Sequence, residues 1–123
     1  MISYLSGTPI ILHDRVILLV NGVGYGVYVG AKTLRRFADL PNAELYIHTH
    51  VREDAITLFG FEDHTSLSLF EQLLDVSGVG PKTAVVIADA GANAVVTAVQ
   101  TADVAFFSAI KKIRKKLAQK III

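Results

Sequence analysis

The hydrophobic periodicity of the chain changes once, near residues 62–64, and this change limits the possible folds more than any single motif does. Before it, short runs of branched apolar residues and one alternating segment are typical of strands. These segments are residues 10–20, 27–29, 45–51 and 55–61. From Asp63 onward, apolar residues recur at helical spacing, with no Pro-, Gly- or Ser-rich linker between the two parts. We therefore expect a multidomain α+β chain, with a β domain at residues 1–63 and an all-α domain at residues 64–123.

The first part has room for about five short strands, with one short helix near residues 32–38. Asn21-Gly22 predicts a hairpin turn, and Arg52-Glu53-Asp54 predicts a second one that pairs residues 55–61 with the preceding strand. Glycines inside strands permit the bulges by which a small sheet closes into a barrel. The pattern favours a small closed barrel such as an OB-fold, although two packed layers of sheet would also satisfy it.

In the second part, residues 66–74, 94–100 and 104–110 are expected to be helical, and Gly91-Ala92-Asn93 interrupts a helix. This part also contains an internal repeat, because residues 76–88 align with residues 110–122. The aligned pairs are Val76 with Ile110, Val79 with Ile113, Lys82 with Lys116, Ala84 with Ala118 and Ile87 with Ile121. Each copy has two apolar positions and then a turn with a basic residue that opens a helix. Two related helical units are expected, although an apolar-rich chain can also produce such an agreement by chance.

Charge is distributed unevenly along the chain. The net charge is +1, from 12 Lys and Arg and 11 Asp and Glu. Residues 111–123 hold six basic residues and no acid, whereas residues 1–110 hold six basic residues and all 11 acids, a balance of −5. A concentrated positive end on an acidic body favours an anionic partner, while a solvated terminus would have the same composition.

Several classes of site and location are excluded by composition. The chain has no cysteine, which excludes disulfides, thiolate metal sites and a cysteine nucleophile. No apolar run approaches the roughly 18 residues of a membrane span, and the first residues do not have the composition of a signal peptide. A cytoplasmic protein without membrane contact is therefore expected.

No residue pattern indicates catalysis or a bound cofactor. His48 and His50 lie on one face of a predicted strand, but a third ligand is missing from the pattern, so no metal is expected. Gly22-Val23-Gly24-Tyr25-Gly26 has the wrong spacing for a dinucleotide fingerprint, and a strand follows it. No serine has the sequence context of a nucleophile.

The strongest local motif is Ser77-Gly78-Val79-Gly80-Pro81-Lys82-Thr83-Ala84. A Gly-x-Gly turn that leads into a helix lets backbone N–H groups point at a phosphate, and the helix N-terminus adds positive potential. Pro81 suits the first helical turn, Val79 is expected to pack beneath the turn, and Lys82 can contact a phosphate. The motif predicts a helix-hairpin-helix that binds nucleic-acid backbone without reading sequence. A simple tight turn between helices is the alternative.

The second copy of the repeat carries Lys112 and Arg114 where the first has Gly78 and Gly80. The substitution adds positive charge and removes the backbone freedom that glycine supplies. It predicts continued attraction of phosphate with a different turn geometry. An isolated amphipathic basic helix would also fit this segment.

Together, these motifs make the chain resemble the RuvA family, the Holliday-junction-binding subunits of the bacterial branch-migration complex. The resemblance is carried by Val51-Arg52-Glu53-Asp54-Ala55 leading into Leu58-Phe59-Gly60-Phe61, and by the motif at residues 77–82. The segments 1–7 and 21–25 are also similar to that family, so the resemblance extends over essentially the whole chain.

The resemblance implies an OB-fold barrel and an all-α domain with tandem helix-hairpin-helix motifs. It also implies a fourfold homotetramer, or an octamer, that holds the arms of a four-way DNA junction on a concave face. It assigns Glu53 and Asp54 to an acidic pin at the tetramer centre, where repulsion of phosphates keeps the crossover open. The implied DNA-binding residues are those of the first hairpin, Gly78, Val79, Gly80, Lys82 and Thr83, and those of the second, Lys112, Arg114, Lys115 and Lys116.

The resemblance also implies partners. The family acts with the RuvB ATPase and the RuvC resolvase, so ATP hydrolysis is expected in the partner, and this chain is expected to be a non-catalytic subunit without a cofactor. The family's third, motor-binding domain lies beyond residue 123, and the sequence as given is expected to bind junctions but to couple poorly to the motor.

Two other classes of protein remain open at this stage. A metal-dependent nuclease or repair-enzyme fragment would use the hairpin for docking and carboxylates such as Glu53, Asp54, Glu62 and Asp63 for a metal. An interaction module would use its apolar surface to build an oligomer and would not bind DNA.

Overall fold

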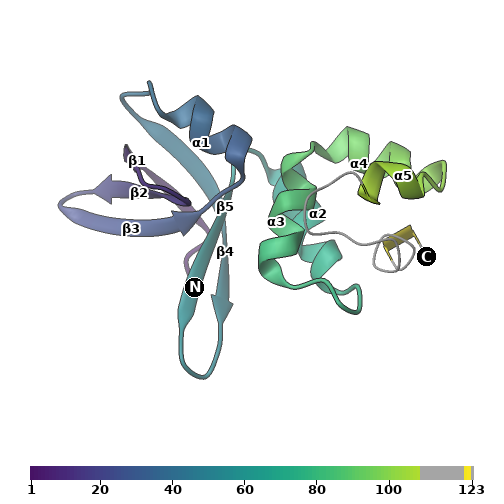
Figure 1. Cartoon of the computed structure of the whole chain (residues 1–123). Helices are drawn as coiled ribbons and strands as arrows, with labels where there is room; N and C mark the ends of the chain where they lie inside the picture. Colours follow the sequence, from purple (N-terminus) through teal and green to yellow (C-terminus); the bar gives the residue numbers. More distant parts are fainter. Residues whose placement is uncertain (109–120, 123) are drawn as a thin grey trace. The chain divides into compact units, whose positions relative to one another are not determined.

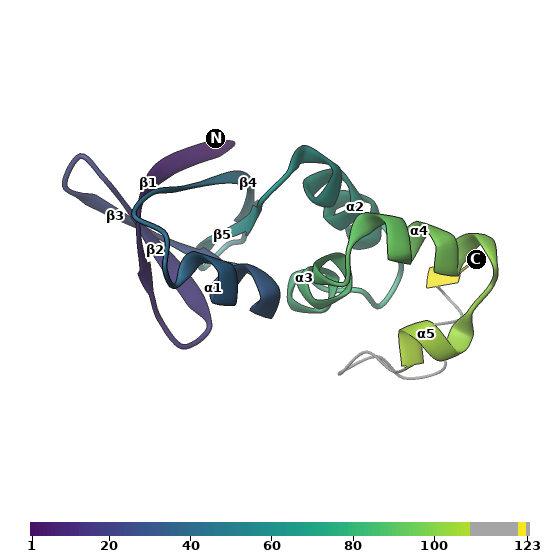
Figure 2. The ribbon, with the colours of Figure 1, turned by 90° about the horizontal axis from the view of Figure 1, so that it is seen from above.

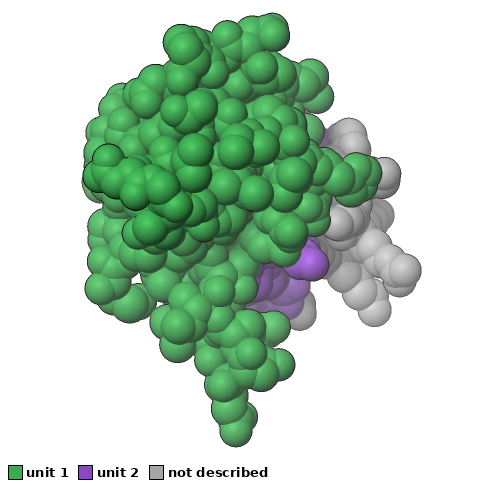
Figure 3. All heavy atoms as spheres, turned by 90° about the vertical axis from the view of Figure 1, so that its left-hand side faces the viewer, with its two compact units in different colours: residues 1–67 green, residues 68–123 purple. Residues whose placement is uncertain are grey.

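The structure is a computed structural model that describes residues 1–108 and 121–122, and the chain divides into two compact units. Unit 1 comprises residues 1–67 and unit 2 residues 68–123, coloured green and purple in Figure 3. Strands form only in the first unit among the described residues, and the remainder is helical, which confirms the expected α+β class. The division lies inside helix α2, His64–Leu74, and the domain boundary near residue 63 stays a prediction.

Unit 1 is a closed five-stranded barrel of OB type (Figure 1), so the alternative of two packed sheets is wrong. Around the barrel the strands follow the order β1-β2-β3-β5-β4, and only β3 and β5 pair in parallel. Helix α1, Ala31–Phe37, connects β3 to β4, close to the predicted range of residues 32–38. The strands are β1 Tyr4–Ile11, β2 Arg15–Val20, β3 Val23–Tyr28, β4 Ala43–Val51 and β5 Ile56–Phe61.

The run at residues 10–20 is two strands and not one, which corrects the sequence-based expectation. The backbone N–H of Leu12 donates to the carbonyl oxygen of Arg15 at 2.9 Å and closes a turn between them. Apolar residues on both sides of this turn then pair with one another across β1 and β2, for example Ile11 with Val16. The short polar stretch His13-Asp14-Arg15 between the two apolar runs is the sequence signal of this reversal of the chain.

The two predicted hairpin turns are both present. Asn21 and Gly22 have φ values of +50° and +84°, and Val20 pairs with Val23, so these residues form the two-residue loop that joins β2 to β3. The second turn joins β4 to β5, where the N–H of Arg52 donates to the carbonyl oxygen of Ala55 at 2.8 Å. Figure 1 shows this second hairpin projecting beyond the rest of the barrel, and it forms the narrow extension at the bottom of the green unit in Figure 3.

The barrel interior is filled by buried apolar side chains from β2, β3, β4 and β5 and from the end of α1, and the partly buried Leu5 of β1 packs against them. At Gly7 of β1 the backbone of β2 leaves no room for a side chain, because a Cβ there would lie 2.5 Å from the carbonyl oxygen of Leu19. Hydrophobic burial of this kind is the main stabilising contribution in a small barrel. The core residues are Val16, Leu18, Val27, Val29, Phe37, Ala43, Leu45, Ile47 and Leu58.

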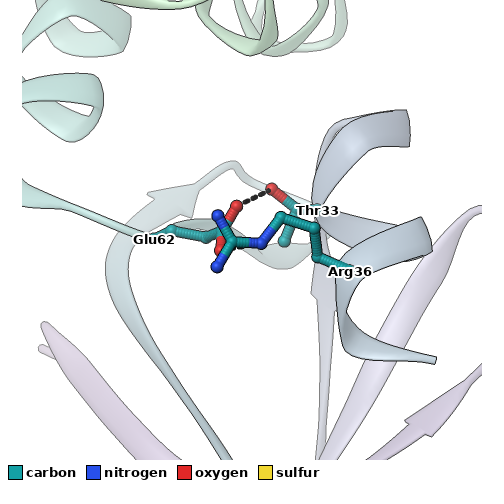
Figure 4. A network of polar contacts seen from close by, with 3 residues as sticks. All are labelled: Thr33, Arg36 and Glu62. Carbon is teal, nitrogen blue, oxygen red and sulfur yellow. Dashed lines mark hydrogen bonds and ion pairs between the residues drawn. The ribbon is translucent and has the colours of Figure 1, made fainter. Parts of the chain in front are cut away.

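A polar contact holds α1 to the segment that leaves β5 (Figure 4). The buried hydroxyl of Thr33 donates to Glu62 Oε2 at 3.3 Å, and Arg36 Nε lies 3.3 Å from Glu62 Oε1. Because Arg36 is mostly exposed, this ion pair contributes little. The main role of Glu62 is to provide a partner for a hydroxyl that is otherwise removed from water.

The helical unit continues from α2 through α3, Pro81–Asp89, α4, Ala92–Gln100, and α5, Val104–Ser108 (Figure 2). Helix α2 is capped by Asp63, whose Oδ1 accepts the N–H of Ser66 at 2.7 Å. The predicted break at residues 91–93 is confirmed at Gly91, whose φ is +102°. In the described part of the chain no single helix is long and apolar enough to cross a membrane; α3 and α4 pass that test only as a pair, and they are bent by 96°.

Candidate nucleic-acid interface

The turn between α2 and α3 is closed by its own backbone. After α2 ends, the N–H of Val76 donates to the carbonyl oxygen of Leu73, and the N–H of Val79 donates to that of Val76, both at 3.0 Å. Within this turn Gly78 has a φ of +88°, a conformation that an L side chain adopts only with strain. The residue type at position 78 is therefore set by the geometry of the turn.

Val79 lies beneath the turn, as expected from the sequence. Its side chain is buried, whereas the flanking Gly78 and Gly80 are exposed. The buried apolar side chain between two exposed glycines anchors the loop to the helical unit. Val79 thus supports the site and does not present its side chain to a ligand.

Gly80 precedes α3 at the N-cap position, and the fold itself does not require glycine there. Its backbone is extended, with φ −89° and ψ 173°, a conformation open to any residue. A Cβ built on Gly80 meets no atom within 4 Å, and no side chain caps the helix. Since Ser, Asp or Asn would cap this helix better, glycine leaves open space at the helix start at some expense in stability.

The first turn of α3 presents backbone donors into that open space. The first helical hydrogen bond runs from the N–H of Ala84 to the carbonyl oxygen of Gly80 at 2.9 Å, and Pro81 has no N–H. The N–H groups of Lys82 and Thr83 precede this bond and have no acceptor within the helix. With the exposed Lys82 side chain beside them, they form a positive surface suited to a phosphate group.

The expected second hairpin lies outside the described residues. This applies to Lys112, Arg114, Lys115 and Lys116, whose roles stay predictions. By sequence, residues 68–108 hold one basic residue, Lys82, and the four acids Glu71, Asp75, Asp89 and Asp103. Attraction of a polyanion to this unit at long range must therefore come from the basic segment 111–120.

The predicted acidic pin is the tip of the β4–β5 hairpin. Glu53 and Asp54 occupy the turn between Arg52 and Ala55, and every residue from Val51 to Ile56 is exposed. Val51 and Ile56 flank the carboxylates with exposed fractions of 57% and 71%. The tip therefore carries two carboxylates, the positive charge of the adjoining Arg52 and two apolar side chains at the end of a projecting hairpin.

The carboxylates considered for a nuclease site do not form a cluster. Glu53 and Asp54 precede β5, whereas Glu62 and Asp63 follow it, and a six-residue strand separates them by about 20 Å. Glu62 contacts Thr33 and Arg36, and Asp63 caps α2. Across residues 1–108 and 121–122, no group of three or more His, Cys, Asp or Glu could hold a metal ion.

The two histidines of β4 lie side by side, with ring centroids 6.1 Å apart. Burial lowers the pKa of His50, and the nearby Arg52 and His48 act in the same direction. The ring of His50 also packs edge-on against Phe59 at 6.2 Å. These contacts pack the ring of His50 against the barrel wall.

A closed OB-type barrel followed by helices joined through a glycine-rich hairpin defines a class of proteins with a barrel and a helix-hairpin-helix domain. Comparison with protein families agrees with this class: residues 1–60 match the RuvA N terminal domain, and residues 70–123 match the SAM-like Helix-hairpin-helix tandem. The chain belongs to the RuvA family.

Similar proteins are named Holliday junction branch migration complex subunit RuvA. The one from Bdellovibrio bacteriovorus is 39% identical over 127 residues, covering 100% of this chain and 65% of the relative. That from Trichlorobacter lovleyi is 41% identical over 127 residues, and that from Limosilactobacillus fermentum 38% over 125. Both alignments cover 100% of this chain and 62% of the relative, so the chain spans somewhat less than two thirds of the length of these proteins.

Proposed function

We propose that this chain binds four-way (Holliday) DNA junctions without sequence specificity and presents them for branch migration in recombination and repair. The observation that carries this proposal is the start of α3. A glycine that the fold does not require, two backbone N–H groups without an acceptor in the helix and the exposed Lys82 lie together there. Such a surface contacts phosphates, which are the same in every sequence. The names of the similar proteins support a junction as the DNA structure concerned.

A single copy of this site is too weakly charged to hold DNA firmly. With Lys82 as the one basic residue of the first hairpin, affinity has to come from the second hairpin and from several copies acting together. We propose a homotetramer in which Gly78, Val79, Gly80, Lys82 and Thr83 form the first clamp in each subunit. Lys112, Arg114, Lys115 and Lys116 supply the second clamp, and two tetramers facing one junction would form an octamer.

The acidic tip has a distinct role in this proposal. Carboxylates at Glu53 and Asp54 would repel phosphates at the crossover, so the strands stay apart where the four arms meet. The proposed partners are a RuvB ATPase, which would supply the energy of ATP hydrolysis, and a RuvC resolvase. The proposal also locates the chain in the cytoplasm, where it would meet its DNA substrate.

The test is binding to a synthetic four-way junction and to linear duplex of equal length, by fluorescence anisotropy across a salt series. We expect tighter binding to the junction and an affinity that falls steeply as the salt concentration rises. The slope of log affinity against log salt concentration should be about −0.9 for each phosphate contacted. Equal affinity for the two DNAs would contradict junction recognition. Absence of salt-dependent binding would instead favour an interaction module that builds an oligomer.

Neutralising the acidic tip is expected to keep or to tighten junction binding. The double variant Glu53→Gln, Asp54→Asn removes two negative charges from an exposed turn whose backbone hydrogen bond does not involve either side chain. Because these charges repel phosphate, junction affinity should stay equal or rise by roughly two- to tenfold at low salt. The measurement is the same junction titration, with the exposed Asp39→Asn as the matched control on the barrel.

Weaker junction binding by the double variant, with Asp39→Asn unchanged, would contradict a repulsive tip. A metal-dependent nuclease makes a different prediction, since these substitutions would abolish cleavage of the junction in the presence of Mg²⁺. Incubation of labelled junction with the parent chain and Mg²⁺ distinguishes the two functions, and we expect the DNA to remain intact.

A further inference from the structure

The outer wall of the barrel carries an open groove that the proposed function does not use. Its volume is about 370 Å³, within the range of small-ligand sites, and it crosses β2, β3 and the first residues of β5. It is lined by Arg15, Gly24, Gly26, Tyr28, Ile56 and Thr57, with Ile17 and Leu58 completing it. All of these residues belong to unit 1.

The floor of the groove is made by two glycines on the outward face of β3. Gly24 and Gly26 alternate with Tyr25 and Val27, whose side chains pack toward the barrel core. A Cβ on Gly26 would make only ordinary contacts, 3.8 Å and 3.9 Å from the Arg15 side chain. Glycine weakens a strand, and neither space nor a positive φ requires it at Gly26. Its effect is to keep the groove open.

One wall of the groove combines a cation with an aromatic ring. Arg15 and Tyr28 are opposite each other on β2 and β3, the guanidinium lies 5.7 Å from the ring centroid, and Nη1 donates to the Tyr28 hydroxyl at 3.3 Å. Among residues 1–108 and 121–122, Arg15 has no carboxylate partner. An arginine held against a tyrosine in this way keeps its charge available for an anion while the ring offers an apolar face.

The groove adjoins the hairpin that carries the acidic tip. Ile56 and Thr57 line it and directly follow the turn with Glu53 and Asp54, and Ile56 is 71% exposed. If the tip separates strands, as the proposed function has it, unpaired nucleotides arise beside this groove. The groove offers a floor of peptide backbone, an aromatic ring and one cation, and barrels of this type hold single-stranded DNA with aromatic and basic side chains.

We propose that this groove holds one unpaired nucleotide of a DNA strand, with its base on the floor of Gly24 and Gly26 beside Tyr28 and Ile56, and its phosphate on Arg15. The proposal rests on the proposed junction-binding function. It adds a site for single-stranded DNA on the barrel to the backbone contacts of the helical unit.

The test uses a short fluorescent oligothymidylate and the full chain, with duplex DNA titrated in parallel. Gly26→Val fills the groove, and Arg15→Gln removes its cation; Arg35→Gln removes the same charge from the exposed surface of α1. We expect the first two variants to bind the oligonucleotide at least roughly fivefold more weakly. Arg15→Gln should also reduce the log-log salt slope by about 0.7. Arg35→Gln should stay within about twofold of the parent, since a distant exposed charge is screened.

Circular dichroism and the urea midpoint verify that each variant is folded, and Arg15→Gln keeps the test valid if Gly26→Val does not fold. Unchanged oligonucleotide binding by folded variants, while the parent binds duplex and junction, would overturn the groove site and leave the proposed function standing. A parent that binds no DNA at all would overturn both. A change of oligomeric state in Gly26→Val and Arg15→Gln, seen by sedimentation without loss of oligonucleotide binding, would show that the groove takes protein and not a nucleotide.

Discussion

Gly80→Asp is expected to weaken DNA binding by roughly 10- to 100-fold while leaving the helical unit at least as stable as in the parent. Aspartate is a favoured N-cap residue, the extended backbone at Gly80 suits it, and the space around its Cβ is empty. Its carboxylate would accept the same backbone N–H groups that a phosphate would use and would repel the phosphate. A charge-assisted hydrogen bond of this kind contributes about 1.5–3 kcal/mol.

The measurement pairs junction titration with urea unfolding for the parent, Gly80→Asp and Gly80→Ser. Serine caps the helix without a charge, so Gly80→Ser should keep more of the DNA affinity than Gly80→Asp while gaining a similar few tenths of a kcal/mol in stability. Stability and binding are then expected to change in opposite directions. If Gly80→Asp binds the junction as the parent does, the start of α3 is not a phosphate contact.

The largest loss of stability is expected for Gly7→Ala in β1. A Cβ at this position would lie 2.5 Å from the backbone carbonyl oxygen of Leu19 and 2.9 Å from Cγ2 of Val20, closer than real Cβ atoms come. The carbonyl cannot rotate away as a side chain does, so β1 and β2 must separate. Overpacking of this kind lowers the free energy of unfolding by about 2–3 kcal/mol, a large share of the 5–15 kcal/mol that is typical of a domain.

Urea unfolding of the two alanine variants Gly7→Ala and Gly26→Ala provides the comparison. At Gly26 the nearest atoms to a Cβ are 3.8 Å away, on the flexible side chain of Arg15. Gly26→Ala should therefore change the free energy of unfolding by less than about 1 kcal/mol, and in the stabilising direction, because alanine reduces the freedom of the unfolded chain. Equal destabilisation by both variants would show that loss of glycine as such, and not the close approach at Gly7, determines the effect.

The barrel and the first hairpin could be predicted because each depends on local chemistry. Asn21-Gly22 supplies two residues with positive φ, and the structure has them at +50° and +84° in a two-residue loop. In the same way, the apolar Val79 between two glycines predicted a buried side chain under an exposed turn. In both patterns, a few neighbouring residues determine the local conformation, so the sequence alone is enough to predict it.

Other features depend on contacts between distant residues, which no local pattern reveals. The reversal between Leu12 and Arg15 was missed because long apolar runs lie on both sides of a short polar stretch, and the pairing of Ile11 with Val16 is what shows two strands. The separation of Glu53 and Asp54 from Glu62 follows from the extended strand between them, although all three are close in sequence. The groove was also missed. Its sequence signal is the alternation of Gly24 and Gly26, but this pattern indicates a groove only when the pairing of Arg15 with Tyr28 is known.

The most direct test of the central claim, that the hairpin before α3 is the DNA contact, is hydrogen–deuterium exchange of the full chain with and without a saturating four-way junction at low salt. We predict slower exchange in peptides that cover residues 76–84, centred on the N–H groups of Lys82 and Thr83, which have no acceptor within the helix. A matched experiment at high salt should remove this protection as the complex dissociates. Junction binding confirmed by anisotropy in the same sample, with unchanged exchange at residues 76–84, would contradict the claim.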